Sequence, residues 1–94
     1  MPTSILTPGT TPDTSGEIVV VAGAPVTVGM YRDDEELLDH ECRGLIYRKD
    51  ADANWGQTKF SLNRVKPNLV IIGPGTYHVR RSGAITTPTG VQVD

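Results

Sequence analysis

Short β-prone runs alternate with turn residues along most of this chain, and this punctuation is the feature that most limits its fold. The runs begin at Glu17 and recur at intervals near ten residues, with no helical periodicity between them. Ten glycines and seven prolines in 94 residues supply the turns. The expected strands are residues 17–22, 25–31, 42–49, 55–62, 67–72, 76–81 and 90–94. We therefore expect an all-β fold, an antiparallel β-sandwich of about seven strands.

Residues 1–16 differ from the rest in composition, with three prolines, five threonines and no periodic apolar pattern. Proline cannot donate to the ladder of a central strand or continue a helix. We therefore divide the chain into an extended N-terminal arm, residues 1–16, and a sandwich domain, residues 17–94. The arm is either disordered or becomes ordered against a neighbouring subunit, and we favour the second. The side chains expected to contact the neighbour are Ile5, Leu6, Pro8 and Pro12.

Residues 73–79 follow the pattern that begins strand F of an Ig-type sandwich. In that pattern the ring of Tyr77 packs inward and its hydroxyl bonds back to a nearby loop, the tyrosine corner. Val79 stands where antibody domains carry a cysteine, so the core would be apolar without a disulfide. Trp55 is expected to cover one end of the core and Phe60 to point inward. The sequence thus predicts a small Ig-like sandwich with these four residues in its core.

Oxygen-bearing side chains at Asp50, Asp52 and Asn54 suggest a calcium loop, because alternate oxygens wrap this cation. An EF-hand loop needs glycine at its sixth position and glutamate at its twelfth, where this chain has Trp55 and Ser61. Asp and Asn also favour turns for their own hydrogen bonds to the backbone. We interpret residues 50–54 as a hairpin turn, with calcium binding as the alternative.

Neither a metal centre nor a catalytic centre is predicted. Asp39, His40, Glu41 and Cys42 are adjacent, and adjacent side chains of an extended chain point to opposite sides. A Cys42–His78 pair lacks an orienting residue and an oxyanion hole at recognisable spacing. With one cysteine, no disulfide can form within the chain. We expect a non-enzymatic protein without a cofactor.

Charge and hydropathy exclude two further classes of partner. The net charge of −2 and the pI near 5.6 argue against binding to nucleic acid or to anionic lipid. No run of about 20 apolar residues is present, so we expect a soluble protein without a membrane span.

Four basic residues form either ordinary edge charge or a contact for an acidic partner, such as residues 33–36 of a neighbouring copy. They are Arg64, Lys66, Arg80 and Arg81.

The order of several short motifs resembles that of small virion proteins of tailed bacteriophages. The motifs are the valine pair near residue 20, residues 47–50, Asn54-Trp55, Leu62 and residues 73–79, and the resemblance covers residues 17–81. In that group, small Ig-like or sandwich modules decorate heads, collars or fibres, and no catalytic residues carry over. The arm is similar to extensions by which capsid-decorating proteins clasp neighbouring subunits.

The resemblance implies a structural protein of the virion, assembled in the host cytoplasm. We expect a capsid decoration or cementing protein that binds the outer head surface in several copies or as a homo-oligomer. Its partners would be the major capsid protein or other virion subunits. The alternative is an Ig-like adhesion or carbohydrate-binding module on a fibre or cell surface, which would need exposed aromatic residues on a flat face.

Overall fold

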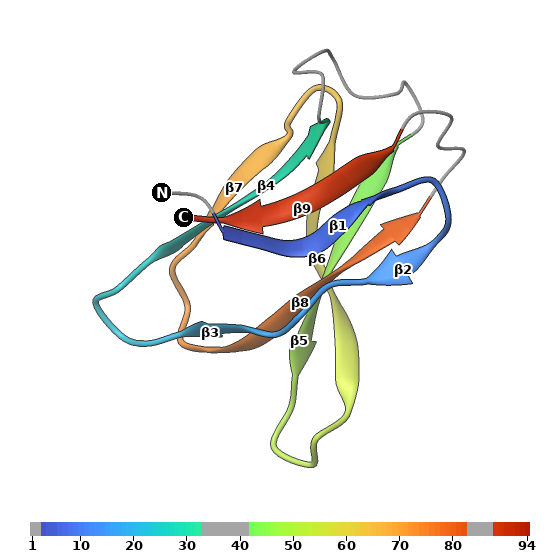
Figure 1. The fold of residues 1–94 in the computed structure, drawn as a ribbon. Helices are drawn as coiled ribbons and strands as arrows, with labels where there is room; N and C mark the ends of the chain where they lie inside the picture. Colours follow the sequence, from blue (N-terminus) through green and yellow to red (C-terminus); the bar gives the residue numbers. More distant parts are fainter. Residues whose placement is uncertain (1–2, 33–41, 83–87) are drawn as a thin grey trace.

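The computed structural model describes residues 3–32, 42–82 and 88–94, and in this part every regular element is a strand. The strands form two antiparallel sheets that face each other across a shared core (Figure 1). The expected all-β sandwich is therefore confirmed. The strands are β1 (Thr3–Gly9), β2 (Asp13–Thr14), β3 (Ile18–Val20), β4 (Val26–Arg32), β5 (Arg43–Lys49), β6 (Trp55–Asn63), β7 (Asn68–Ile71), β8 (Gly75–Ser82) and β9 (Thr89–Val93).

The order of the strands is that of a jelly roll. One sheet has the order β1-β9-β4-β7 and the other β2-β8-β5-β6, with β3 also pairing to β8. Because β2 and β3 follow each other along the same edge of β8, they act as one strand interrupted at residues 15–17. The last strand pairs with the first, whereas in an Ig-type sandwich the last strand pairs with the one before it.

The core lies between the sheets. Successive side chains of a strand point to opposite faces, so every second side chain points into this space. Val28 and Met30 of β4 are 0% and 4% exposed, on the face that the period-two pattern of residues 25–31 indicates. The opposite sheet contributes Ile46, Leu62 and Val79, all of them fully buried. Leu62 and Val79 therefore occupy the inward positions that the alternation of their strands predicts.

The N-terminal segment lies within the sandwich, in contrast to the separate arm expected from its composition. β1 pairs with β9, with Thr3 opposite Val93 and Leu6 opposite Val91, and Figure 1 shows the two strands side by side. Proline is tolerated here because β1 is the edge strand of its sheet, where a missing amide breaks no ladder. The described parts of residues 1–16 and 17–94 therefore share one core.

The four side chains expected to contact a neighbour occupy different environments. Leu6 is a core residue, 9% exposed, and Ile5 packs against that core. Pro8 is half-buried within β1, and Pro12 is exposed in the connection to β2. The docking-arm expectation is corrected for a physical reason: the apolar pair completes this chain's own sheet, so the ordering entropy is offset without a partner.

Arg81 of β8 points between the sheets instead of into solvent. It is 3% exposed, and its guanidinium donates hydrogen bonds to the carbonyl oxygens of Thr7 at 3.1 Å, Thr11 at 2.8 Å and Thr89 at 2.7 Å. The side chain therefore joins β8 of one sheet to β1 and β9 of the other. The expected surface patch of basic residues does not include Arg81, because its charge is used inside the fold.

Ser15 forms hydrogen bonds with β8 on the same side of the sandwich. Its amide donates to the carbonyl oxygen of Val79 at 2.8 Å, and its hydroxyl oxygen accepts a hydrogen bond from the Val79 amide at 2.9 Å. This pair of bonds continues the pairing with β8 through the gap between β2 and β3. We call the side formed by β1, β2 and β3 the closed side.

Candidate functional site

A cavity opens between the two sheets on the opposite side, where β6 and β7 lie. Its volume is about 340 Å³, at the lower end of the roughly 300–1,000 Å³ range of ligand pockets. β6 is the last strand of one sheet and β7 is the last strand of the other, so both layers end here. The cavity's aliphatic and phenyl side chains are those of Ile46, Phe60, Leu69, Val70, Ile71 and Ile72. We call this cavity the apolar slot.

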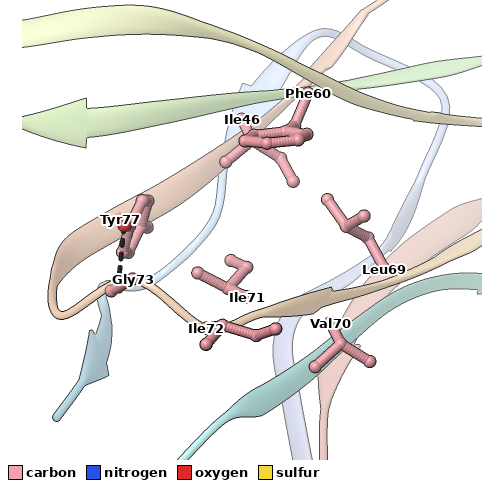
Figure 2. Close-up of a pocket in the computed structure, with 8 residues that line it drawn as sticks. All are labelled: Ile46, Phe60, Leu69, Val70, Ile71, Ile72, Gly73 and Tyr77. Carbon is pink, nitrogen blue, oxygen red and sulfur yellow. Dashed lines mark hydrogen bonds between the residues drawn. The ribbon is translucent and has the colours of Figure 1, made fainter. Parts of the chain in front are cut away.

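The walls of the apolar slot come from both sheets. Figure 2 shows Ile46 and Phe60 on one side, facing Leu69 and Ile71 on the other. Leu69 and Ile71 point inward because they stand opposite the inward-facing valines of β4 in the ladder. At one end the hydroxyl of Tyr77 donates to the Gly73 carbonyl oxygen at 2.8 Å, the dashed line of Figure 2. This is the bond to a nearby loop that the tyrosine-corner pattern predicts.

Phe60 lies at the mouth of the slot and is 49% exposed, although its strand pattern places it in the core. The ladder between β5 and β6 is irregular between Leu45 and Tyr47. Thr58 fills this irregularity: its hydroxyl donates to the Ile46 carbonyl oxygen at 2.8 Å and accepts from the Phe60 amide at 3.1 Å. Phe60 keeps its inward direction, but no described strand lies beyond β6 to cover the ring.

β7 presents an apolar edge. Its sequence from Asn68 to Ile71 contains no charge and no proline, and Val70 and Ile72 are 51% and 69% exposed. Edge strands usually carry charged residues, prolines or bulges, because an unpaired row of amides and carbonyls invites other strands. The outer edge of β7 has none of these features along Asn68–Ile71, and no strand of the described ranges pairs with it.

A second group of side chains stacks on the outer face of the other sheet. The ring of Trp55 lies 3.8 Å from that of His78 between centroids, and the Tyr47 ring is 5.6 Å from His78. The guanidinium of Arg80 lies 3.8 Å from the centre of the Tyr47 ring. Trp55 is therefore only half-buried and covers His78, and it does not close the end of the core as expected. Tyr77 and Val79 lie in the core and Trp55 and Phe60 lie outside it.

His78 is held in its neutral form within this stack. Its side chain is enclosed by rings, and burial, followed by the charge of Arg80, lowers the pKa of His78 below 6.5, while Glu17 opposes the shift. The Nε of Arg80 donates a hydrogen bond of 3.0 Å to Nε2 of His78, and only an unprotonated Nε2 accepts it. The arrangement keeps the imidazole uncharged near neutral pH, as a structural part of the sheet.

The β5–β6 hairpin ends in the turn expected at residues 50–54. One carboxylate oxygen of Asp50 accepts hydrogen bonds from the amides of Asp52 and Asn54, each at 2.9 Å. Ala53 has a φ of 64°, in the left-handed region that closes the turn. One carboxylate oxygen of Asp50 is therefore engaged by the turn's own backbone, as the hairpin-turn interpretation expects.

Cys42 and His78 do not form a catalytic pair. Cys42 is fully buried just before β5, whereas His78 stands opposite Tyr47, five residues further along that strand. At about 3.3 Å per residue the two positions are roughly 16 Å apart along the strand, and they face opposite sides of the sheet. Within the described residues no group of three or more His, Cys, Asp or Glu side chains could hold a metal ion. Asp39, His40 and Glu41, like the acidic residues 33–36, lie outside the described residues.

The sequence interpretation missed the apolar slot. Residues 67–72 are expected from the sequence only as a short strand, although the run is continuously apolar. The same pattern fits an edge strand with apolar side chains on both faces, and the lack of charge and proline after Pro67 is the signal for an unprotected edge. In the described part of the chain there is no helix of the length and hydropathy needed to cross a membrane. Neither the models of known protein families nor the curated proteins contain a match to this chain.

Proposed function

We propose that this chain is a non-enzymatic structural protein of a tailed-bacteriophage virion, and that it decorates or cements the head by binding capsid protein. The observation that carries the proposal is the apolar slot, with half-exposed Phe60 at its mouth and exposed Val70 and Ile72 beside it. Apolar surface gathered at one opening of a small protein is typical of a protein-binding site. Attachment is assigned to this slot, because the N-terminal segment is already paired within the chain's own sheet.

The order of the strands is compatible with the proposed virion role. Jelly rolls recur in viral capsid proteins and in lectins, so the architecture is compatible with a virion role without establishing it. The short motifs that resemble those of small phage virion proteins lie within residues 17–81, which include β6, β7 and all residues of the apolar slot. The resemblance supports the proposed class of protein, and the slot supports the proposed binding site.

Carbohydrate binding is the second candidate, favoured by Trp55 and Tyr47 on the outer face of a sheet. A sugar ring stacks on a free aromatic face. One face of Trp55 covers His78, and Arg80 lies over Tyr47 at 3.8 Å. Both rings are therefore engaged within the protein, and the slot offers the larger unoccupied apolar surface.

Quantitative mass spectrometry of particles produced by the encoding phage tests the proposal. The chain is expected in many copies per particle. Phe60→Glu, which places a charge at the mouth of the slot, should lower the copy number by roughly tenfold. Val65→Glu is the matched control, because Val65 is 94% exposed and does not line the slot.

Absence of the wild-type chain from the particles would contradict the virion role. Equal copy numbers for the Phe60 and Val65 variants would contradict attachment through the slot. Binding of the wild-type chain to a glycan array, abolished by Trp55→Ala, would favour the carbohydrate-binding candidate instead.

A further inference from the structure

The two sides of the sandwich differ in how their edges are protected. On the closed side, Pro8 and two register shifts interrupt the edge of β1. Arg81 links the two sheets there, and Ser15 continues the pairing with β8 between β2 and β3. On the other side, none of the strands that the structure describes pairs with the outer edge of β6 or β7. Among residues 3–32, 42–82 and 88–94, hydrogen bonds therefore close one side of the sandwich, and no strand covers the outer edges of β6 and β7 on the other.

The open side combines the two features that a strand-binding groove requires. An added strand gains main-chain hydrogen bonds from a free edge, and pockets for its alternate side chains provide selectivity. β7 offers the free edge, with no charge or proline along Asn68–Ile71. The apolar slot beside it, about 340 Å³ in volume, has room for a few aliphatic side chains and is too small for a large ligand.

Charges around the slot indicate the chemistry of its occupant. Lys59 of β6 has its Nζ 6.0 Å from the centre of the Phe60 ring, at the mouth of the slot. Lys66 is exposed in the turn that leads into β7, where its amide and carbonyl bond to Asn63. Arg48 is at the other end, donating to the carbonyl oxygen of Pro74 at 2.8 Å, next to Gly73 of the slot. Cations thus flank the slot at its mouth and at both ends.

The acidic residues within the described ranges lie elsewhere. Asp50 and Asp52 are at the tip of the β5–β6 hairpin, and Asp13 is in β2 on the closed side. Glu17 lies 3.9 Å from Lys49, and Asp94 follows β9, two strands away from β7. A strand that enters the slot therefore meets apolar walls between basic ends.

We propose that the open edge of β7 binds an extended segment of a partner protein, with aliphatic residues at alternate positions and acidic residues at both ends. The segment joins the four-stranded sheet as a strand next to β7, and its aliphatic side chains enter the apolar slot beside Phe60. Lys59, Lys66 and Arg48 attract the acidic ends. This inference rests on the proposed function and specifies the part of the capsid partner that is recognised.

Fluorescence anisotropy with synthetic peptides tests the inference on the full chain. The probe is a peptide of about seven residues with valine at alternate positions and glutamate at both ends. Three matched peptides carry lysine at the ends, serine in place of valine, or a central proline that removes an amide. The glutamate-ended peptide should bind roughly tenfold or more tightly than each of the three, and the preference over lysine ends should weaken in high salt.

Two protein variants separate the slot from the rest of the surface. Lys59→Glu combined with Lys66→Glu changes only exposed side chains and should shift the preference toward the lysine-ended peptide. Phe60→Ser should weaken binding of the glutamate-ended peptide, whereas Val19→Ser, at an exposed position in β3 on the closed side, should not. Circular dichroism confirms that each variant is folded.

Equal affinity for the four peptides would overturn the inference, as would binding that the central proline or the Phe60 variant leaves unchanged. A dimer in sedimentation that Phe60→Ser dissociates would also overturn it, because the occupant would then be a second copy. The peptide assay contains no phage particle, so its failure is distinguishable from failure of the virion role. Selective peptide binding by a chain absent from particles would support the inference and reject the virion role.

Discussion

Arg81 in β8 donates a hydrogen bond to the carbonyl oxygen of Thr7 in β1, which precedes it by 74 residues. The same guanidinium reaches Thr89 of β9, so one buried side chain holds the N-terminal strand, the C-terminal strand and the opposite sheet together. A buried cation is tolerated when it is hydrogen-bonded, and three backbone carbonyls accept hydrogen bonds from Nε and Nη1 of this one. The closed side depends on this contact, and the following predictions test it and the features around it.

Arg81→Met should lower the free energy of unfolding by about 2 kcal/mol. Methionine retains apolar bulk but removes three hydrogen bonds donated by a charged group, and one hydrogen bond to a charged group contributes about 1.5–3 kcal/mol. Urea unfolding followed by circular dichroism measures the change. Arg43→Met is the control: Arg43 is exposed in β5, so its loss should stay within about 0.5 kcal/mol. Equal losses would contradict the structural role of Arg81.

Leu6→Ala should destabilise the isolated chain by about 2 kcal/mol, because a core leucine loses its burial and leaves a cavity. Thr7→Ala, at the exposed neighbouring position of β1, should change the stability by less than about 0.5 kcal/mol. Thermal and urea unfolding of the purified proteins measure both. An unchanged stability for Leu6→Ala would show that β1 is not part of the sandwich and would restore the docking-arm hypothesis.

Tyr77→Phe should cost about 1 kcal/mol, because it removes the 2.8 Å bond to the Gly73 carbonyl while keeping the buried ring. Tyr31→Phe is a matched change, since the Tyr31 hydroxyl donates to Ser4 at 3.0 Å in an exposed position. Water replaces an exposed partner, so the second variant should lose less than about 0.5 kcal/mol. Urea unfolding gives the free energy of unfolding of each variant, and the difference between the two values is the contribution of the tyrosine-corner hydrogen bond. If Tyr31→Phe lost as much stability as Tyr77→Phe, this contribution would be contradicted.

Stability should fall as the pH drops below 6.5. The pKa of His78 is lowered in the folded protein by burial and by Arg80, so the unfolded chain binds a proton at a higher pH than the folded chain does. Between the ordinary pKa and the lowered one, the unfolded state gains protons and the folded state does not, which favours unfolding. Urea midpoints at about pH 7.5 and pH 5.5 measure this loss.

His78→Gln provides the comparison for the pH experiment, because glutamine accepts the Arg80 hydrogen bond without titrating. The difference in stability between the two pH values should be smaller in this variant than in the wild-type chain. The carboxylates that do not act on His78 contribute equally to both proteins and cancel in the comparison, whereas Glu17 acts on His78 itself. A pH dependence that is identical in the two proteins would contradict the lowered pKa of His78.

The strand positions could be predicted closely because they depend on local pattern. The run at residues 25–31 corresponds to β4, and its inward side chains were identified from alternation alone. Tyr77 and its bond to Gly73 were also predictable, because a glycine-flanked turn followed by an inward tyrosine is a local motif. Each of these features depends on residues that lie within a few positions of one another.

The position of Phe60 shows where local pattern stops being sufficient. Alternation determines that its side chain points toward the core, but its exposure depends on whether another strand lies beyond β6. In the same way, Pro8 excludes residues 3–9 from a central strand of a sheet but not from an edge strand. The apolar slot has the same origin, since Phe60 and Leu69 belong to different sheets that end on the same side.

The sequence by itself determined that this protein is built from short strands, several of them with one apolar face, and where most of those strands begin and end. Only the tertiary structure decided that the first strand pairs with the last, that Arg81 lies inside and that β7 is the outermost of the described strands in its sheet. The physical reason is that alternation and turn chemistry act over a few residues. Strand partners and exposed edges depend on contacts between segments that are far apart in the chain.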